Sequence, residues 1–365
     1  MKLGSSVVAG PDGAPRLDVL AAVCDQLARL HAQGDEPIVV TSGAIARGMR
    51  VMDLPQRPST VGALQAASAV GQGKLYRVYD ELLRERDVIS AQVLLTFFDM
   101  SARTHYLNAR QTLSTLLEWR VLPVINENDT TATDEISFGD NDFLAAQVAV
   151  LIGADELILM TDIDGLYTAD PRLHPDARIV AEVSDFAALE ELEVGHTTSP
   201  LGSGGMRSKV VAAEMATAAG IPTVICNGLR ADALAGVLEG RREGTRFAAG
   251  EARYSSFKLW LKYAKPARGM LVVDAGAARA VREGSASLLP VGVTEVKGEF
   301  DAGDAVEIVE RGSSGAGHAR PLAKGICSYS AQELRQVIGM KSDAVRAILP
   351  RATDEAIHRD YLVVD

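Results

Sequence analysis

Residues 126–142 read NENDTTATDEISFGDND, and the segments on either side of them indicate the fold. The apolar run VLPVI at 121–125 has the composition of a strand, and the run FLAAQVAVLIGA at 143–154 has that of a buried helix. We therefore expect 126–142 to be a loop that joins a strand to a helix. Open α/β sheets bind their ligands at such loops, beyond the carboxyl ends of parallel strands.

The two ends of this stretch, NEND and GDND, are unusually rich in polar side chains. They hold four carboxylates and three asparagines: Glu127, Asp129, Asp140 and Asp142, and Asn126, Asn128 and Asn141. A solvated acidic turn is the alternative interpretation, because Asn and Asp are common turn residues. The choice between a turn and a ligand site depends on the motifs elsewhere in the chain.

Composition limits the classes of function. A chain of 365 residues exceeds what one hydrophobic core usually supports, so about two domains are expected. The net charge of -11 disfavours nucleic acid or an anionic membrane as the main target. No segment reaches the roughly 18 apolar residues of a membrane span, and the N-terminus lacks a signal-peptide apolar region. The three cysteines show no paired spacing, which fits a reducing cytoplasm.

Strand-like and helical segments alternate along the first part of the chain. Apolar residues recur at helical spacing over 17–30, and Gly34 is expected to end that helix. Residues 60–86 are expected to be helical, with a break at Gly71 and Gly73. A further helix is expected over 101–119, with Ser101 as its candidate cap. The expected strands are PIVV (37–40), VISAQVLL (88–95), VLPVI (121–125), ELILMTD (156–162) and PTVIC (222–226). This alternation predicts a three-layer αβα sandwich with a mostly parallel central sheet.

The pattern changes after about residue 250. Short runs such as GMLVVDAG, LLPVGVTEV and AVEIVERG are separated by glycine and acidic turns, which predicts a small β-rich domain. The expected boundaries are a first domain over 1–250, a linker over 251–268, the β-rich domain over 269–349 and a C-terminal tail over 350–365.

Three glycine-containing turns stand beside strands or helices: LGSS at 3–6, TSGA at 41–44 and GSGGMRSK at 202–209. Glycine lets backbone N–H groups approach phosphate oxygens, although each turn alone also fits a structural role. None of them ends in the Gly-Lys-Ser/Thr of a Walker A loop. Lys2 and Lys209 accompany the first and third turns, and two such lysines would neutralise a transferring phosphoryl group. A small-molecule kinase is therefore predicted. Only Met1 precedes Lys2, so the first strand is expected to be clipped or to begin upstream.

A set of motifs in a fixed order carries a family resemblance. The motifs KLGSS, TSGAIARG, PVINENDT, SFGDND, LMTDIDGLYTADPR and GSGGMRSK resemble those of the amino acid kinase superfamily and, within it, of the glutamate 5-kinase family. The resemblance covers about residues 1–248, and about residues 269–349 are similar to a PUA domain. It implies the amino acid kinase fold and a homo-oligomer, either a dimer or a tetramer.

The resemblance also implies an activity. This is the ATP-dependent phosphorylation of the L-glutamate side-chain carboxylate to L-glutamyl 5-phosphate, the first step of proline biosynthesis, with proline as a feedback inhibitor. ATP would be the co-substrate and would be accompanied by Mg²⁺. The chemistry of the acceptor is consistent with this, because a carboxyl with a pKa of about 4.3 is ionised at neutral pH and needs no general base. The reaction needs charge neutralisation and alignment instead.

Specific positions match the family's functional residues. Lys2 and Lys209 would bind the ATP phosphates and stabilise the transition state, and Asp142 would hold both ammonium groups. The expected glutamate-binding residues are Ser42, Asn126, Asp129 and Asn141, with Asp129 facing the α-ammonium group. The expected nucleotide-binding residues are Lys2, Thr161, Asp162, Ser203, Gly204, Gly205, Met206, Arg207, Ser208 and Lys209. No protein ligand for Mg²⁺ is nominated, since this ion binds mainly phosphates and water in such sites.

Other kinases of this superfamily are the alternatives among enzymes. A kinase for N-acetylglutamate or aspartate is one, but an acetylated amine would match the acidic NEND segment poorly. Uridylate or isopentenyl phosphate kinases are less favoured, because an acidic loop would repel a phosphate acceptor. RNA binding by the PUA-like part is the alternative from another class. Residues 269–365 hold 11 basic and 14 acidic side chains, a net charge of -3, which favours a structural or regulatory role over RNA binding.

Overall fold

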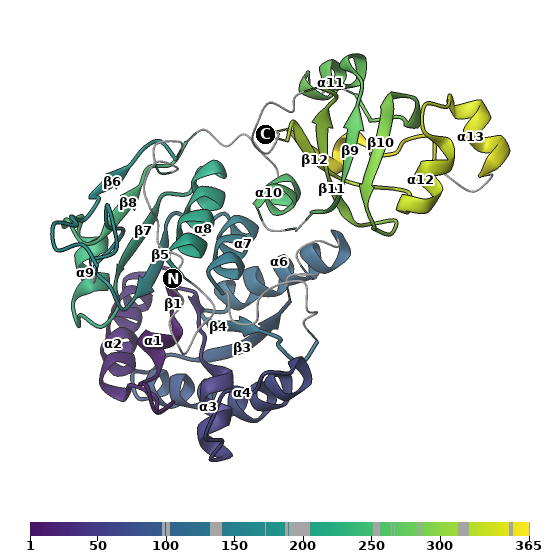
Figure 1. Ribbon diagram of the computed structural model, residues 1–365. Helices are drawn as coiled ribbons and strands as arrows, with labels where there is room; N and C mark the ends of the chain where they lie inside the picture. The colour runs from purple at the N-terminus through teal and green to yellow at the C-terminus, as the bar shows by residue number, and fades with distance from the viewer. Residues whose placement is uncertain are drawn as a thin grey trace. The chain divides into compact units, whose positions relative to one another are not determined.

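The computed structural model describes residues 1–96, 99, 103–131, 141–171, 173–186, 189, 205–250, 256–263, 265, 267–283, 286–312, 321–349 and 353–364. They form two compact units, residues 1–253 and 254–365 (Figure 1). The domain boundaries expected at 250, 268 and 349 stay predictions. Within the described ranges, no helix combines the length and the apolar character needed to cross a bilayer.

In the described part of the first unit, eight strands form one sheet in the order β3-β4-β2-β1-β5-β7-β8-β6. The strands are β1 Lys2–Leu3, β2 Val39–Val40, β3 Ser90–Leu95, β4 Leu122–Glu127, β5 Leu157–Thr161, β6 Glu182–Val183, β7 Thr223–Asn227 and β8 Thr245–Phe247. Every pair of neighbours is parallel except β7 and β8. The prediction of a mostly parallel sheet is therefore confirmed.

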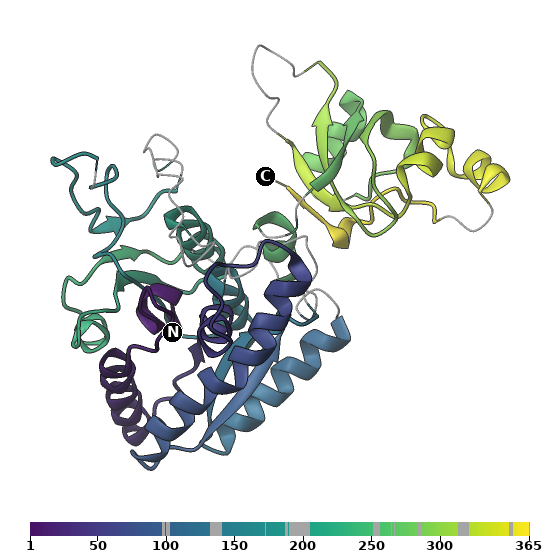
Figure 2. The ribbon, with the colours of Figure 1, turned by 60° about the horizontal axis from the view of Figure 1, so that its bottom comes forward.

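Helices cover both faces of this sheet. They are α1 Ser5–Val8, α2 Leu17–Gln33, α3 Ala44–Val51, α4 Val61–Arg84, α6 Arg103–Glu118, α7 Asn141–Ile152, α8 Met206–Ala218 and α9 Ala233–Leu238. Figure 1 shows α6, α7 and α8 on one face, and Figure 2 brings forward the opposite face with α2 and α4. Gly34 ends α2 in the left-handed conformation, with φ 103°, as expected. The three-layer arrangement is therefore confirmed, while the expected cap Ser101 lies outside the described residues.

The break expected at Gly71 and Gly73 is wrong, because α4 runs without interruption from Val61 to Arg84. Gly71 instead permits close packing between α3 and α4. A Cβ atom on Gly71 would lie 1.9 Å from the Ala44 carbonyl oxygen, and one on Gly48 would lie 1.7 Å from the Ala67 carbonyl oxygen. Both contacts are with backbone atoms, so only glycine fits at these two positions.

The loop expected over 126–142 is too long at both ends. Strand β4 continues through Glu127, because Asn126 and Glu127 pair with Leu94 and Leu95 of β3. Helix α7 begins at Asn141, so Asp142 lies in its first turn, where the positive end of the helix dipole favours a carboxylate. Residues 132–140, which include Asp140, lie outside the described residues.

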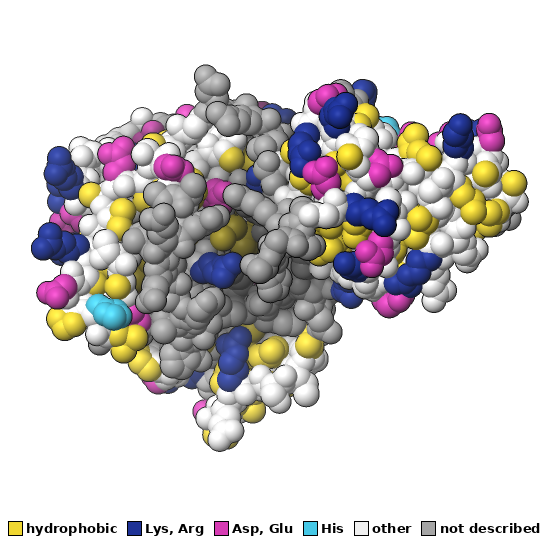
Figure 3. All heavy atoms as spheres, turned by 45° about the horizontal axis from the view of Figure 1, so that its top comes forward, with side chains coloured by type: hydrophobic (Ala, Val, Ile, Leu, Met, Phe, Trp, Pro, Cys, Tyr) yellow, Lys and Arg dark blue, Asp and Glu magenta, His cyan; other side chains and the backbone are white. Residues whose placement is uncertain are grey.

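The described part of the second unit contains a five-stranded sheet in the order β10-β9-β11-β12-β13. Its strands are β9 Ala267–Val273, β10 Val293–Gly298, β11 Ala305–Glu310, β12 Ala323–Ile326 and β13 Leu362–Val364. Its helices are α10 Ser256–Tyr263, α11 Ala275–Arg282, α12 Ala331–Val337 and α13 Ser342–Ile348. The prediction of a β-rich second part is confirmed. On the face drawn in Figure 3, its Lys and Arg side chains are interspersed with Asp and Glu.

Candidate active site

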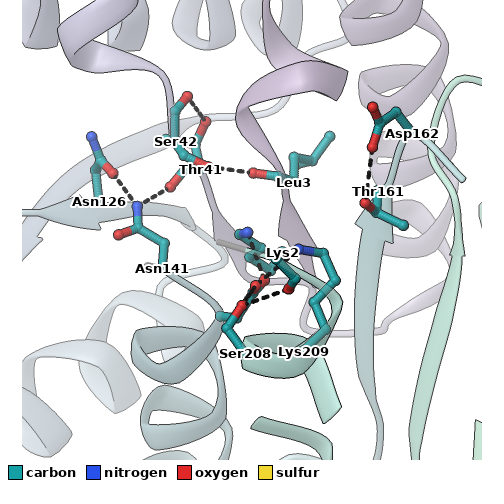
Figure 4. Close-up of polar contacts among 12 residues, drawn as sticks. Lys2, Leu3, Thr41, Ser42, Asn126, Asn141, Thr161, Asp162, Ser208 and Lys209 are labelled. Atoms are coloured by element: carbon teal, nitrogen blue, oxygen red, sulfur yellow. Dashed lines mark hydrogen bonds and ion pairs between the residues drawn. The ribbon is translucent and has the colours of Figure 1, made fainter. Parts of the chain in front are cut away.

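The Asp142 carboxylate lies between two lysine ammonium groups. Lys2 Nζ is 2.6 Å from Asp142 Oδ1, and Lys209 Nζ is 3.0 Å from Asp142 Oδ2. The Ser208 hydroxyl also donates to Oδ2, at 2.9 Å. These residues come from β1 and from the first turns of α7 and α8, which converge here (Figure 4). The fold thus brings Lys2, Asp142 and Lys209 together, while their roles in the reaction stay predictions.

All three charged groups are buried: the relative exposure is 0% for Asp142, 3% for Lys2 and 5% for Lys209. Burial alone would raise the pKa of the Asp142 carboxyl. The charges and hydrogen bonds of Lys2 and Lys209 outweigh burial and hold that pKa below its ordinary value. The carboxylate is therefore ionised at neutral pH. Together the three groups carry one net positive charge, which suits a site for an anion such as phosphate.

A pocket gathers the four residues expected to bind the acceptor. It is lined by Ser42, Asn126, Asp129 and Asn141, together with Ser5, Arg57 and residues 43–46. These four residues come from β4 and its C-terminal end, from the segment before α3, and from the first residue of α7. The fold therefore brings together positions that are scattered through the sequence.

Hydrogen bonds fix the polar side chains of the pocket. Asn141 Nδ2 donates to the Thr41 carbonyl oxygen at 2.5 Å and to Asn126 Oδ1 at 2.6 Å (Figure 4). The Ser42 hydroxyl donates to the Leu3 carbonyl oxygen at 2.8 Å. Asn141 Oδ1 is buried and has no hydrogen-bond partner in the described part of the chain. A buried acceptor left without a donor is costly, so this atom is suited to receive one from a ligand.

Asp129 is the acidic side chain of the pocket. It is buried, and the Ser68 hydroxyl of α4 donates to its Oδ2 at 2.5 Å. Burial raises the pKa of Asp129, and the Ser68 hydrogen bond and the charge of Arg57 offset that rise only in part. An ionised carboxylate here is stabilised further when a cation enters the pocket.

The N-terminus of α3 contributes backbone groups to the pocket. Gly43 has φ 99° and precedes the helix, and as the N-cap residue it has no side chain that could cap the N–H groups of the first turn. Residues 43–46 line the pocket. Uncapped N–H groups and the helix dipole favour a negative charge, so this side of the pocket suits a carboxylate or phosphoryl oxygen.

Some residues that line the pocket or support it were not predicted from the sequence. Ser68 and Gln72 lie one turn apart on α4, and they bond Asp129 and Asn126 respectively. Arg57 lies in the segment between α3 and α4. None of the three belongs to a glycine turn or to the family's motifs, so no local sequence pattern points to them. Ser5 was quoted within KLGSS, but no role was expected for it.

The expected nucleotide-binding residues are only partly described. Thr161 ends β5, the strand that pairs with β1 beside Lys2, and its hydroxyl donates to Asp162 Oδ1 at 3.2 Å. Gly205 precedes α8, and Met206 and Arg207 lie in its first turn with Ser208 and Lys209. Ser203 and Gly204 lie outside the described residues. Nucleotide binding by this set stays a prediction.

Family models match both parts of the chain. Residues 1–227 match the model of the amino acid kinase family, and residues 269–349 match that of the PUA domain. A crystal structure of T. acidophilum isopentenyl phosphate kinase is similar with a TM-score of 0.47 and 16% identity, over 67% of this chain and 97% of that one.

Curated relatives match over the whole chain. A protein named glutamate 5-kinase from Meiothermus ruber is 46% identical over 100% of this chain and 94% of its own length. A protein of the same name from Synechococcus sp. strain JA-3-3Ab is 42% identical over 100% of this chain and 97% of its own. The chain therefore belongs to the amino acid kinase family and, within it, to the glutamate 5-kinases.

Proposed function

We propose that the protein transfers the γ-phosphoryl group of ATP to the side-chain carboxylate of L-glutamate and so forms L-glutamyl 5-phosphate. The observation that carries the proposal is the buried Asp142 carboxylate between Lys2 and Lys209, next in sequence to Asn141 of the pocket. Family membership supports the same reaction class. The fold alone would not identify the acceptor.

The chemistry requires positive charge more than a base. The acceptor carboxylate and the γ-phosphate are both anions, so their approach is opposed until cations neutralise them. Lys2 and Lys209 supply two ammonium groups, and Asp142 fixes their positions through ion pairs of 2.6 and 3.0 Å. The acceptor is already ionised at neutral pH, so no side chain has to remove a proton.

The pocket residues favour one orientation of the acceptor. Asn141 adjoins Asp142 on α7, and Ser42 bonds the carbonyl of Leu3, the neighbour of Lys2. These neighbours support an orientation in which the reacting carboxylate lies on the side of Ser42 and Asn141. The amino end then lies at Asp129, whose carboxylate pairs with the α-ammonium group. N-acetylglutamate lacks that ammonium group and would leave the Asp129 carboxylate without a hydrogen-bonding cation from the ligand.

Magnesium would enter with the nucleotide. The described residues contain no cluster of three or more His, Cys, Asp or Glu side chains that could hold an ion, and Asp142 is already engaged by two lysines. Magnesium ions in such sites are usually held mainly by phosphates and water. Bound there, magnesium would neutralise part of the phosphate charge.

The wider setting of the reaction belongs to the same proposal. We place it as the first step of proline biosynthesis with proline as a feedback inhibitor, and family membership is the support for both. The homo-oligomer and the cytoplasmic location stay predictions.

Trapping of the acyl phosphate tests the proposal. The full-length protein is incubated with ATP, magnesium and hydroxylamine together with L-glutamate, N-acetylglutamate or L-aspartate, and the hydroxamate product is measured. We expect a signal with glutamate and a much weaker signal with the other two acids. A signal with N-acetylglutamate and none with glutamate would sink the proposal.

A further inference from the structure

Arg57 is the basic side chain in the lining of the pocket, and the phosphoryl transfer proposed above assigns it no role. It lies in the exposed segment between α3 and α4 and lines the pocket together with Asp129, Asn126 and Asn141. Lys2 and Lys209 already account for the positive charge at the Asp142 carboxylate. Arg57 therefore adds a further positive charge, at the pocket itself.

The segment that carries Arg57 is held at both ends. Helices α3 and α4 pack closely at Gly48 and Gly71, where their backbones are in direct contact. Pro55 and Pro58 flank Arg57, and each proline fixes its own φ angle. Pro58 also disfavours the helical conformation at Arg57 itself. The backbone that carries Arg57 thus has little conformational freedom left to lose on binding.

Arg57 and Asp129 form a pair of opposite charges within one pocket. Desolvation lowers the pKa of Arg57, and the Asp129 carboxylate partly offsets this effect. The charge of Arg57 in turn moderates the rise in the pKa of Asp129. Such a pair complements a zwitterion, in which an ammonium and a carboxylate group share one carbon atom.

We propose that Arg57 is a specificity residue that binds the α-carboxylate of the acceptor while Asp129 binds its α-ammonium group. This rests on the proposed function, which directs the side-chain carboxylate toward Ser42 and Asn141 and leaves the α-carbon on the side of Asp129. The planar guanidinium makes two parallel hydrogen bonds to a carboxylate, which a lysine cannot do. The pocket then selects an α-amino acid through two opposite charges.

Two truncated ligands separate the roles of Arg57 and Asp129. Glutarate is glutamate without the ammonium group, and 4-aminobutanoate is glutamate without the α-carboxylate. Dissociation constants for both compounds and for glutamate are measured by calorimetry with the full-length protein. The variants are Arg57→Ala, Arg57→Lys and Asp129→Asn. The control is Arg50→Ala, which removes an exposed arginine of α3 that pairs with Asp12 away from the pocket.

The Arg57 and Asp129 variants are expected to weaken the binding of different truncated ligands. Arg57→Ala weakens glutamate and glutarate by about ten- to a hundredfold, the range for a lost hydrogen-bonded charge pair, and leaves 4-aminobutanoate within about twofold. Asp129→Asn weakens glutamate and 4-aminobutanoate but not glutarate. Arg57→Lys is intermediate, because it keeps the charge but loses the second hydrogen bond. Arg50→Ala changes none of the three constants.

Other outcomes overturn the assignment. Equal weakening of all three ligands by Arg57→Ala would mean a general electrostatic or structural role for Arg57. No change with any ligand would remove Arg57 from the site. Failure of the proposed function is distinguishable from both, because the unmodified protein would then not bind glutamate or form its hydroxamate. Unfolding curves for each variant show whether the fold is kept.

Discussion

The ammonium nitrogen of Lys2 lies 2.6 Å from Asp142 Oδ1, although 140 positions of sequence separate the two residues. Lys209 reaches the other oxygen of the same carboxylate, at 3.0 Å. One acidic side chain therefore sets the spacing of two cations that would otherwise repel each other in a buried site. Asp142 is thus the residue at which the stability of the site and its proposed chemistry can be tested together.

Replacement of Asp142 by asparagine should lower stability. The side chain keeps its shape, but two buried ammonium groups lose the negative charge between them, and breaking a buried ion pair costs about 3–5 kcal/mol. We expect the free energy of unfolding in urea at pH 7 to fall by about that amount. Turnover should fall as well, because the lysines lose their fixed positions.

The same variant gives a test with a defined sign in pH. The pKa of Asp142 is depressed in the folded protein, so its stabilising contribution is present above the ordinary aspartate value of about 3.9 and is lost as pH falls below it. The stability difference between the two proteins should stay constant from about pH 5 to 8 and shrink in stronger acid. A difference that disappears between pH 8 and 6 would contradict the ion-pair role of Asp142.

Replacement of Lys209 by alanine should act on turnover. A cation that stabilises transferring charge acts mainly in the transition state, so kcat should fall by about 10²- to 10³-fold while the KM for glutamate changes little. Steady-state hydroxamate assays with glutamate as the varied substrate measure both quantities. An unchanged kcat with a raised KM would instead place Lys209 at the acceptor.

Much of the fold could be predicted because its signals are local. The apolar runs that became β5 and β7 are buried along almost their whole length, as strands covered on both faces must be. The break predicted at Gly71 is wrong because a glycine in a helical stretch fits either a helix break or a close contact with another helix. Which of the two applies depends on α3, a separate segment of the chain, and the residues around Gly71 carry no information about its position.

The candidate site could likewise be predicted only in part from the sequence. The resemblance identified Lys2, Asp142 and Lys209, and the fold brings them within ion-pair distance. Arg57 and Ser68 belong to no quoted motif. Ser68 reaches Asp129 only because it faces inward from α4, which is a property of tertiary packing and not of sequence spacing.

A pair of glycine substitutions on α4 should change stability in opposite directions. Gly71→Ala places a Cβ atom 1.9 Å from the Ala44 carbonyl oxygen, so α3 and α4 must separate. We expect a loss of about 1–3 kcal/mol, the usual cost of overpacking. Gly73→Ala meets no atom within 4 Å on the same helix, and its higher helix propensity should add about 0.5–1 kcal/mol. Urea denaturation measures both effects, and a loss of equal size in the two variants would rule out the packing explanation.

The affinity for glutamate should fall on acidification, because Asp129 must be ionised to bind the ammonium group. The raised pKa of Asp129 makes it take up a proton at a higher pH than an ordinary aspartate. In the empty protein the ionised carboxylate costs stability, and that cost disappears as pH falls. Bound glutamate reverses this preference. The dissociation constant should therefore rise as pH falls through the raised pKa, and binding in that range should release protons.

Asp129→Asn isolates this effect from the titration of glutamate itself, since the free ligand ionises identically in both experiments. The variant should bind glutamate weakly at pH 7 and should lose the part of the pH dependence that exceeds the contribution of the ligand. Calorimetry between about pH 7 and 4.5, in buffers with different ionisation enthalpies, measures the affinity and the released protons together. Parallel pH profiles for the two proteins would show that Asp129 does not pair with the ammonium group, because a group that titrates in the pocket must alter the slope of one profile and not the other.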